Sequence, residues 1–242
     1  MKRSGLLMVL VVAVALVLTG LRFFLFAKKE VAHYTSKPYQ RDEMKYFLEI
    51  APENGKVIIK WNKDIKVQIL PGASPKDSAH VKAIIQELIP ILGKIKISLV
   101  PANGNLTVNF VKSEEEYKKM ANGIFDEGSP KGYAQPDFNK FRTRIESVAI
   151  VISPLAMGVV RGEVIRHEFG HALGFWEHSK SFYNEPNLMG RKSFKDIESA
   201  MKWRDSPHFT RLDKGALAIL YNDNMPVAIS HAELMKGIDT TK

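Results

Sequence analysis

The chain of 242 residues contains no cysteine. It therefore has no disulfide bonds, no thiolate metal ligands and no cysteine nucleophile. This absence does not argue against export from the cell. A chain of this length with 45% hydrophobic residues can bury one substantial core without covalent cross-links.

The sequence also has no pattern typical of nucleic-acid binding. Lysine and arginine number 35 against 26 aspartate and glutamate, which gives a net charge of +9. The basic residues are scattered, and no basic helix is interleaved with aromatic residues. We interpret the surplus charge as that of an ordinary soluble surface, and no nucleic-acid partner is expected.

The N-terminus has a long apolar run. Residues 6–18 are uninterrupted apolar residues that follow Lys2 and Arg3, and the apolar character resumes over 23–27. Residues 1–27 therefore predict an export signal or a membrane anchor. Because leucine stands where signal cleavage requires a small residue, we favour an uncleaved transmembrane helix that holds an extracytoplasmic domain; secretion after cleavage is the alternative.

The remaining chain alternates strand and helix patterns. Polar, mixed residues 28–51 predict a stalk or linker, residues 52–222 a single α+β domain, and residues 223–242 a tail with one short helix. The expected order is strand, helix, two strands, short helix, edge strand, strand and a long helix. The strands are predicted near 56–61, 64–70, 95–100, 106–111, 131–138 and 147–152, and the helices from 74 to 93, 113 to 120 and 210 to 221.

The long helix carries His167-Glu168-Phe169-Gly170-His171. Residues four apart on an α-helix lie one turn above each other, so the two imidazoles can bind one zinc ion. Glu168 then lies beside the metal without ligating it. That is the position of a general base for a zinc-activated water.

The residues that follow extend this pattern. Gly174 can adopt positive φ, end the helix and turn the chain back toward the metal. Glu177 and His178 come next as candidate third ligands, and Met189 lies in a short turn-like segment, residues 187–190.

A zinc-binding helix, a glycine, a third ligand and then a methionine turn together resemble the metzincin superfamily of zinc metallopeptidases, particularly its matrixin-like and astacin-like members. The resemblance implies a zincin domain with a twisted, mostly parallel mixed sheet, an antiparallel edge strand at the substrate cleft, an active-site helix and a smaller C-terminal helical subdomain. It implies Zn²⁺ as cofactor and a metalloendopeptidase activity on peptide or protein substrates. Met189 would form a packing platform under the zinc. The lack of cysteine excludes the cysteine-based latency of many matrixins.

The chain departs from the family pattern at two places. Three residues after the glycine, where the family has histidine, stands Glu177, with His178 one place later. Either Glu177 ligates through its carboxylate or the loop is shifted by one residue and His178 ligates. Two residues after the methionine, where astacin-like and serralysin-like proteins have tyrosine, stands Arg191; Arg191 and Tyr183 are the candidates for stabilising the oxyanion.

Other features have plainer interpretations. His33 and His80 are expected to be surface residues. His208, near a helix start, and His231, in the tail, are minor candidates for metal ligands, and Glu185 would ligate only in a different zincin geometry. Residues 132–135 offer either a strand edge for binding an extended peptide or an ordinary surface loop. The alternative function is a non-catalytic envelope binding or scaffold module that has kept the metzincin fold.

Overall fold

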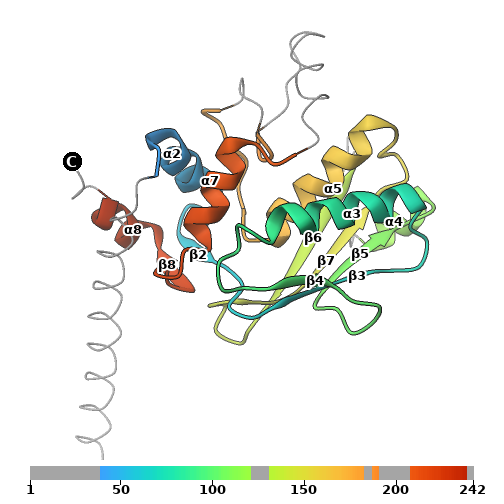
Figure 1. The fold of residues 1–242 in the computed structure, drawn as a ribbon, viewed down its shortest axis with the longest axis horizontal. Helices are drawn as coiled ribbons and strands as arrows, with labels where there is room; N and C mark the ends of the chain where they lie inside the picture. Colours follow the sequence, from blue (N-terminus) through green and yellow to red (C-terminus); the bar gives the residue numbers. More distant parts are fainter. Residues whose placement is uncertain (1–38, 121–130, 183–186, 191–207, 239–242) are drawn as a thin grey trace, which may run out of the picture.

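The computed structural model describes residues 39–120, 131–182, 187–190 and 208–238. This part of the chain is a mixed α+β structure (Figure 1). Its helices are α2 (Arg41–Ile50), α3 (Pro75–Leu88), α4 (Glu114–Met120), α5 (Val159–Ala172), α7 (Arg211–Leu220) and α8 (His231–Ile238). Its strands are β1 (Pro52–Glu53), β2 (Val57–Ile59), β3 (Ile65–Ile69), β4 (Ile97–Leu99), β5 (Leu106–Phe110), β6 (Gly132–Phe138), β7 (Ile145–Ile152) and β8 (Ala228–Ser230).

The larger sheet has five strands in the order β4-β3-β5-β7-β6. The first four run parallel, and β6 pairs antiparallel with β7, with Gly132 opposite Ile152. Because a parallel sheet is covered on its faces, its central strands are rich in buried branched residues. The mixed sheet and its antiparallel edge strand agree with the sequence-based expectation.

Helices α3 and α5 lie on one face of this sheet (Figure 1). Val81 and Leu88 of α3, Phe169 of α5 and Ile150 of β7 belong to one buried core. The neighbouring residue Val151 points to the opposite face, since side chains alternate along a strand, and packs there with Tyr117 of α4. The sheet thus holds α5 rigidly on one side.

Helix starts follow the caps that the sequence contains. Ser74 and Asp77 form a capping box at α3, with Pro75 in the first turn. Thr210 and Asp213 form a second capping box at α7. Each box satisfies N–H groups that a helix leaves without partners at its first turn.

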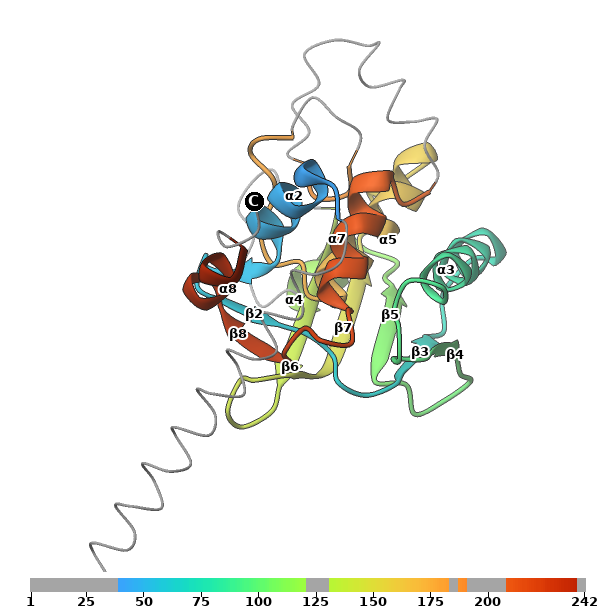
Figure 2. The ribbon, with the colours of Figure 1, turned by 60° about the vertical axis from the view of Figure 1, so that its left-hand side comes forward.

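Residues 28–51 are not simply a stalk. Within them, residues 41–50 form α2, and Tyr46, Phe47 and Ile50 are fully buried in the core. Helix α2 packs beside α7, as two views at 60° show (Figure 2). The prediction missed this helix because it gave weight to the mixed, polar composition of residues 28–51, although the apolar side chains of residues 41–50 gather on one face of a helix.

Residues 223–238 of the predicted tail also belong to the folded unit. Strand β8 pairs antiparallel with β2, and β2 pairs with β1, which gives a small second sheet. Helix α8 follows directly, and Leu234 is fully buried. The predicted short helix is therefore present, and it packs on the domain.

The predicted membrane anchor needs correction. Within the described ranges, no helix is both long and apolar enough to cross a membrane. This finding overturns the expectation of a transmembrane helix and of a membrane-anchored extracytoplasmic location. The apolar run at residues 6–27, on which that expectation rested, lies outside the described residues.

Candidate metal centre

The candidate site lies at the C-terminal half of α5, which carries His167, Glu168 and His171. The two imidazoles are on neighbouring turns of the same helix face, with ring centroids 4.8 Å apart. The four-residue spacing therefore places the rings as the sequence predicted.

Helix α5 ends in a Schellman motif. The N–H of Phe175 donates to the carbonyl of Gly170 at 3.1 Å, and the N–H of Gly174 donates to that of His171 at 3.0 Å. Gly174 has φ of 109°, and a Cβ there would lie 2.7 Å from the carbonyl oxygen of Ile59. Only glycine fits this turn, which sends the chain back toward the two histidines.

The returning chain, residues 173–182, is called the His178 segment. It brings His178 to the other two rings, with centroids 5.1 Å from His167 and 5.2 Å from His171. The Nε2 atoms of His178 and His167 are 3.2 Å apart. The ligand atoms of all three histidines lie within 4.8 Å of one another, and this is the only such cluster in the described part of the chain.

The carboxylate of Glu177 is engaged elsewhere. Its Oε1 accepts a hydrogen bond from the N–H of Asn54 at 3.1 Å, in the turn between β1 and β2. The structure thus brings His178, and not Glu177, to the histidine pair. Of the two candidate third ligands, His178 has the fitting position.

The tautomers of the two helical histidines are fixed by main-chain carbonyls. Nδ1 of His167 lies 2.8 Å from the oxygen of Leu188, and Nδ1 of His171 lies 2.6 Å from that of Phe175. A carbonyl can only accept, so each Nδ1 carries the hydrogen and each Nε2 keeps a lone pair for a metal. Burial lowers the pKa of His171 to about 4, so this ring is neutral at pH 7, as a ligand must be.

These residues fit a tetrahedral zinc ion. Two nitrogens bound to the same zinc at ~2.0–2.1 Å lie about 3.3 Å apart, close to the separation seen between His178 and His167. Three neutral imidazoles leave a fourth position for water or substrate. Closed structural zinc sites, by comparison, have four protein ligands.

Glu168 lies beside this cluster and is 4% exposed. Its Oε2 has no hydrogen-bond partner among the described residues. Burial raises the pKa of Glu168 to about 8. A buried carboxyl oxygen without a hydrogen-bond partner is costly, which makes this residue a candidate for function rather than for stability.

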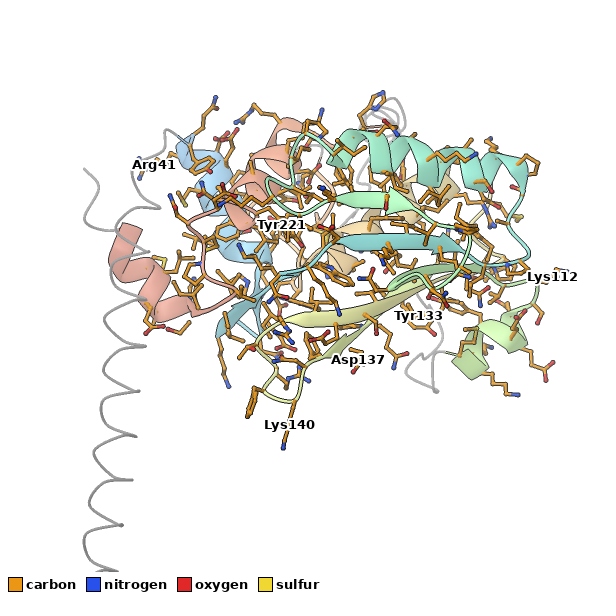
Figure 3. The ribbon with its side chains drawn as sticks, turned by 60° about the horizontal axis from the view of Figure 1, so that its bottom comes forward. Arg41, Lys112, Tyr133, Asp137, Lys140 and Tyr221 are labelled. Atoms are coloured by element: carbon orange, nitrogen blue, oxygen red, sulfur yellow. The ribbon has the colours of Figure 1, made fainter. Side chains whose placement is uncertain are left out.

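Strand β6 passes directly over Glu168. A Cβ on Gly132 would lie 2.8 Å from Cγ and 3.0 Å from Oε1 of Glu168, so glycine is needed for this approach. In the described part of the sheet β6 pairs only with β7, so it is the edge strand. Tyr133 and Asp137 of β6 are seen along this border of the sheet in Figure 3.

Residues 187–190, called the Met189 segment, pack under the helix. Met189 is fully buried. It packs against Gly170 of α5 so closely that a Cβ added to this glycine would lie 2.9 Å from Sδ of Met189. The N–H of Leu188 donates to Oδ1 of Asp213 at 2.8 Å, and that of Met189 donates to the hydroxyl of Tyr46 at 3.1 Å. Met189 is thus a packing residue next to the histidine pair, in agreement with its predicted role.

Asp213 holds the Met189 segment from α7. Its Oδ1 also accepts from the Tyr46 hydroxyl at 2.8 Å, and its Oδ2 accepts from the N–H and hydroxyl of Thr210. Burial, strengthened by the neighbouring carboxylate of Asp213, raises the pKa of Tyr46 well above its ordinary value, so this phenol stays a neutral donor. The sequence predicted that Asp213 caps α7, but it did not predict that Asp213 also bonds Leu188 and Tyr46.

The other described histidines do not join the cluster. His80 packs against Gly162 of α5, His208 contacts Glu87, and His231 begins α8. Tyr183, Glu185, Arg191 and His33 lie outside the described residues. Sequence reasoning missed Tyr46 and Glu49, which the amphipathic pattern of residues 41–50 could have indicated. It also missed the carbonyls of Leu188 and Phe175, which no side-chain pattern can reveal.

Compared with models of known protein families and with curated protein sequences, the chain matches none.

Proposed function

We propose that this chain is a zinc-dependent metallopeptidase of the metzincin type that hydrolyses peptide bonds. The observation that carries the proposal is the convergence of His167, His171 and His178 beside Glu168, a buried carboxylate whose Oε2 has no partner in the described residues. A site built only for structural zinc has no use for such a carboxylate.

The surrounding geometry supports a peptide substrate. The edge strand β6 begins at Gly132, which touches Glu168. An extended peptide that pairs with this edge would bring its backbone past the histidine cluster. Main-chain pairing of this kind accepts many side chains, so it suits a peptidase.

Each residue has a role in this proposal. His167, His171 and His178 would hold the metal through Nε2, and the Leu188 and Phe175 carbonyls keep the helical rings oriented. When bound, zinc polarises the scissile carbonyl and lowers the pKa of a coordinated water toward ~7. Glu168 would take a proton from the attacking water at Oε2 and return it to the leaving amine.

The test compares the wild-type chain with Glu168→Gln, which keeps the shape of the side chain and removes its basicity. Zinc content is measured by metal analysis, and cleavage is measured on a mixed library of peptides. We expect equal zinc in both proteins and cleavage slower by about 100- to 10,000-fold in the variant. The matched control is Glu177→Gln, because the carboxylate of Glu177 accepts a hydrogen bond from Asn54, away from the three histidines. This variant should cleave peptides at the wild-type rate.

Two results would contradict the proposal. If the wild-type chain binds no zinc, the proposed cofactor is wrong. Zinc bound by both proteins with cleavage by neither would leave the alternative of a non-catalytic binding module.

A further inference from the structure

The His178 segment has almost no regular structure of its own. Between the end of α5 and residue 182, the only strand-like pairing is the isolated bridge of Ser179 with Gly190. A metal ligand on such a segment needs support from elsewhere, because an unsupported loop samples many positions for its side chains.

The C-terminal end of α2 supplies this support. On one side of His178, the N–H groups of Trp176 and Glu177 donate to the carbonyl of Ile50 at 2.7 and 3.0 Å. This carbonyl is one of the last of α2, and such groups lack a partner within their own helix. The pairing satisfies the helix end and fixes the chain just before the ligand.

On the other side of His178, one carboxylate oxygen accepts three hydrogen bonds. Oε2 of Glu49 lies 2.7 Å from the hydroxyl of Ser179, and 3.2 Å from the N–H groups of both Lys180 and Ser181. Hydrogen bonds to a charged acceptor are stronger than those between neutral groups. The backbone around His178 is therefore fixed from both directions by two consecutive residues of α2.

The same helix reaches the second supporting segment. Tyr46, one turn before Glu49 on α2, accepts from the N–H of Met189 at 3.1 Å. The adjacent carbonyl, that of Leu188, is the partner of Nδ1 of His167. Helix α2 thus contacts both irregular segments that position the imidazoles.

We propose that α2 is part of the metal site, and that Glu49 is a positioning residue that holds His178 in place for the metal. The inference rests on the proposed function, since it concerns metal binding by the same three histidines. It adds a residue far from the motif in sequence, on a segment that the motif does not include.

The experiment measures zinc affinity of the full chain by chelator competition for wild type, Glu49→Ala and Glu49→Gln. Loss of a partner that orients a ligand typically weakens metal binding by ~10–100-fold, and we expect a loss of this size for Glu49→Ala. Glu49→Gln retains an acceptor oxygen and should lose less. Replacement of zinc by cobalt(II) gives a visible spectrum that reports ligand geometry, and Glu49→Ala should change this spectrum.

Glu43→Ala is the matched control. Glu43 lies on the same helix and contacts Arg211 of α7 and the N–H of Gln40, so its loss loosens α2 without touching the His178 segment. Zinc affinity and the cobalt spectrum should stay at wild-type values in this control, even where its thermal stability falls. If Glu49→Ala does not fold, Ser179→Ala removes one of the same hydrogen bonds from the other side and should weaken zinc binding by a smaller factor.

The outcomes separate the two proposals. Absence of zinc and cobalt binding in the wild-type chain would overturn the proposed function. Normal binding in the wild type with unchanged affinity in Glu49→Ala, or with equal losses in Glu49→Ala and Glu43→Ala, would overturn the role of Glu49 and leave the proposed function intact.

Discussion

The two halves of the candidate site are held by different means. His167, Glu168 and His171 lie on a regular helix packed on a sheet, so their relative positions follow from helix geometry. The His178 and Met189 segments instead depend on hydrogen bonds to residues more than 20 positions away, in α2 and α7. The first half can therefore be predicted from a local sequence pattern. The second half depends on long-range contacts that form only when the chain folds.

The largest expected effect comes from removing the ligand on the irregular half. His178→Ala should weaken zinc binding by more than the ~10–100-fold that loss of an outer partner costs, because a direct ligand is removed. Glu177→Ala should leave zinc affinity unchanged, since its carboxylate bonds Asn54. Competition with a chelator measures both, and the opposite ranking would show that Glu177 is the third ligand.

The junction between the two halves is the next place to disturb. Gly174→Ala puts a Cβ at a positive φ and 2.7 Å from the oxygen of Ile59. We expect a loss of about 3 kcal/mol in the free energy of unfolding, measured with urea. Gly55→Ala, also at positive φ but with open space around it, should lose only ~1 kcal/mol. Equal losses would mean that the contact with Ile59 is relieved by a small shift.

A smaller change tests the hold of α2 on the Met189 segment. Tyr46→Phe removes a hydroxyl that bonds Asp213 and Met189, and should cost about 1–2 kcal/mol of stability with a modest loss of zinc affinity. Tyr39→Phe removes a hydroxyl that bonds Ala218 and Asn222, away from the histidines. The control should keep full zinc affinity, and a similar loss in both variants would contradict a specific role for Tyr46.

The smallest effect is expected on the helical half, at the ion pair of Asp77 in α3 with Arg161 in α5. Burial alone would raise the pKa of Asp77, but hydrogen bonds from Arg161 and Ser74 hold it below 3.8. The unfolded chain therefore takes up a proton first as the pH falls below ~4, and stability is lost there. At neutral pH, Asp77→Asn should lower the free energy of unfolding by about 1 kcal/mol. The variant should also lose less stability than the wild type between pH 7 and pH 3, which urea unfolding at the two pH values measures. If the variant loses as much stability as the wild type between pH 7 and pH 3, other carboxylates cause the loss at low pH.

The same contrast explains how much could be predicted from the sequence. Strand alternation, the capping residues Ser74 and Thr210 and the spacing of His167 and His171 are local signals, and the corresponding elements were predicted correctly. The mixed sheet with its antiparallel edge was predicted through a family resemblance. The metzincin identity itself stays a proposal.

The failures concern long-range contacts. Residues 41–50 were assigned to a stalk from their mixed, polar composition, and their importance comes from packing on α7 and from the hydrogen bonds of Glu49 and Tyr46. The choice between Glu177 and His178 depended on the path of the chain after Gly174. That path is fixed by Ile50 and Glu49, both more than 100 residues earlier.

Pairing of β8 with β2 has a practical consequence for anyone who shortens this chain. Strand β2 is the middle strand of its sheet, with β1 on one side and β8 on the other. Cutting the chain before Ala228 would leave the backbone N–H and C=O groups at one edge of β2 without their β8 partners. A second molecule could then pair one of its own strands with this edge. A truncated version is therefore expected to self-associate, and a purification tag should be attached without removing those residues.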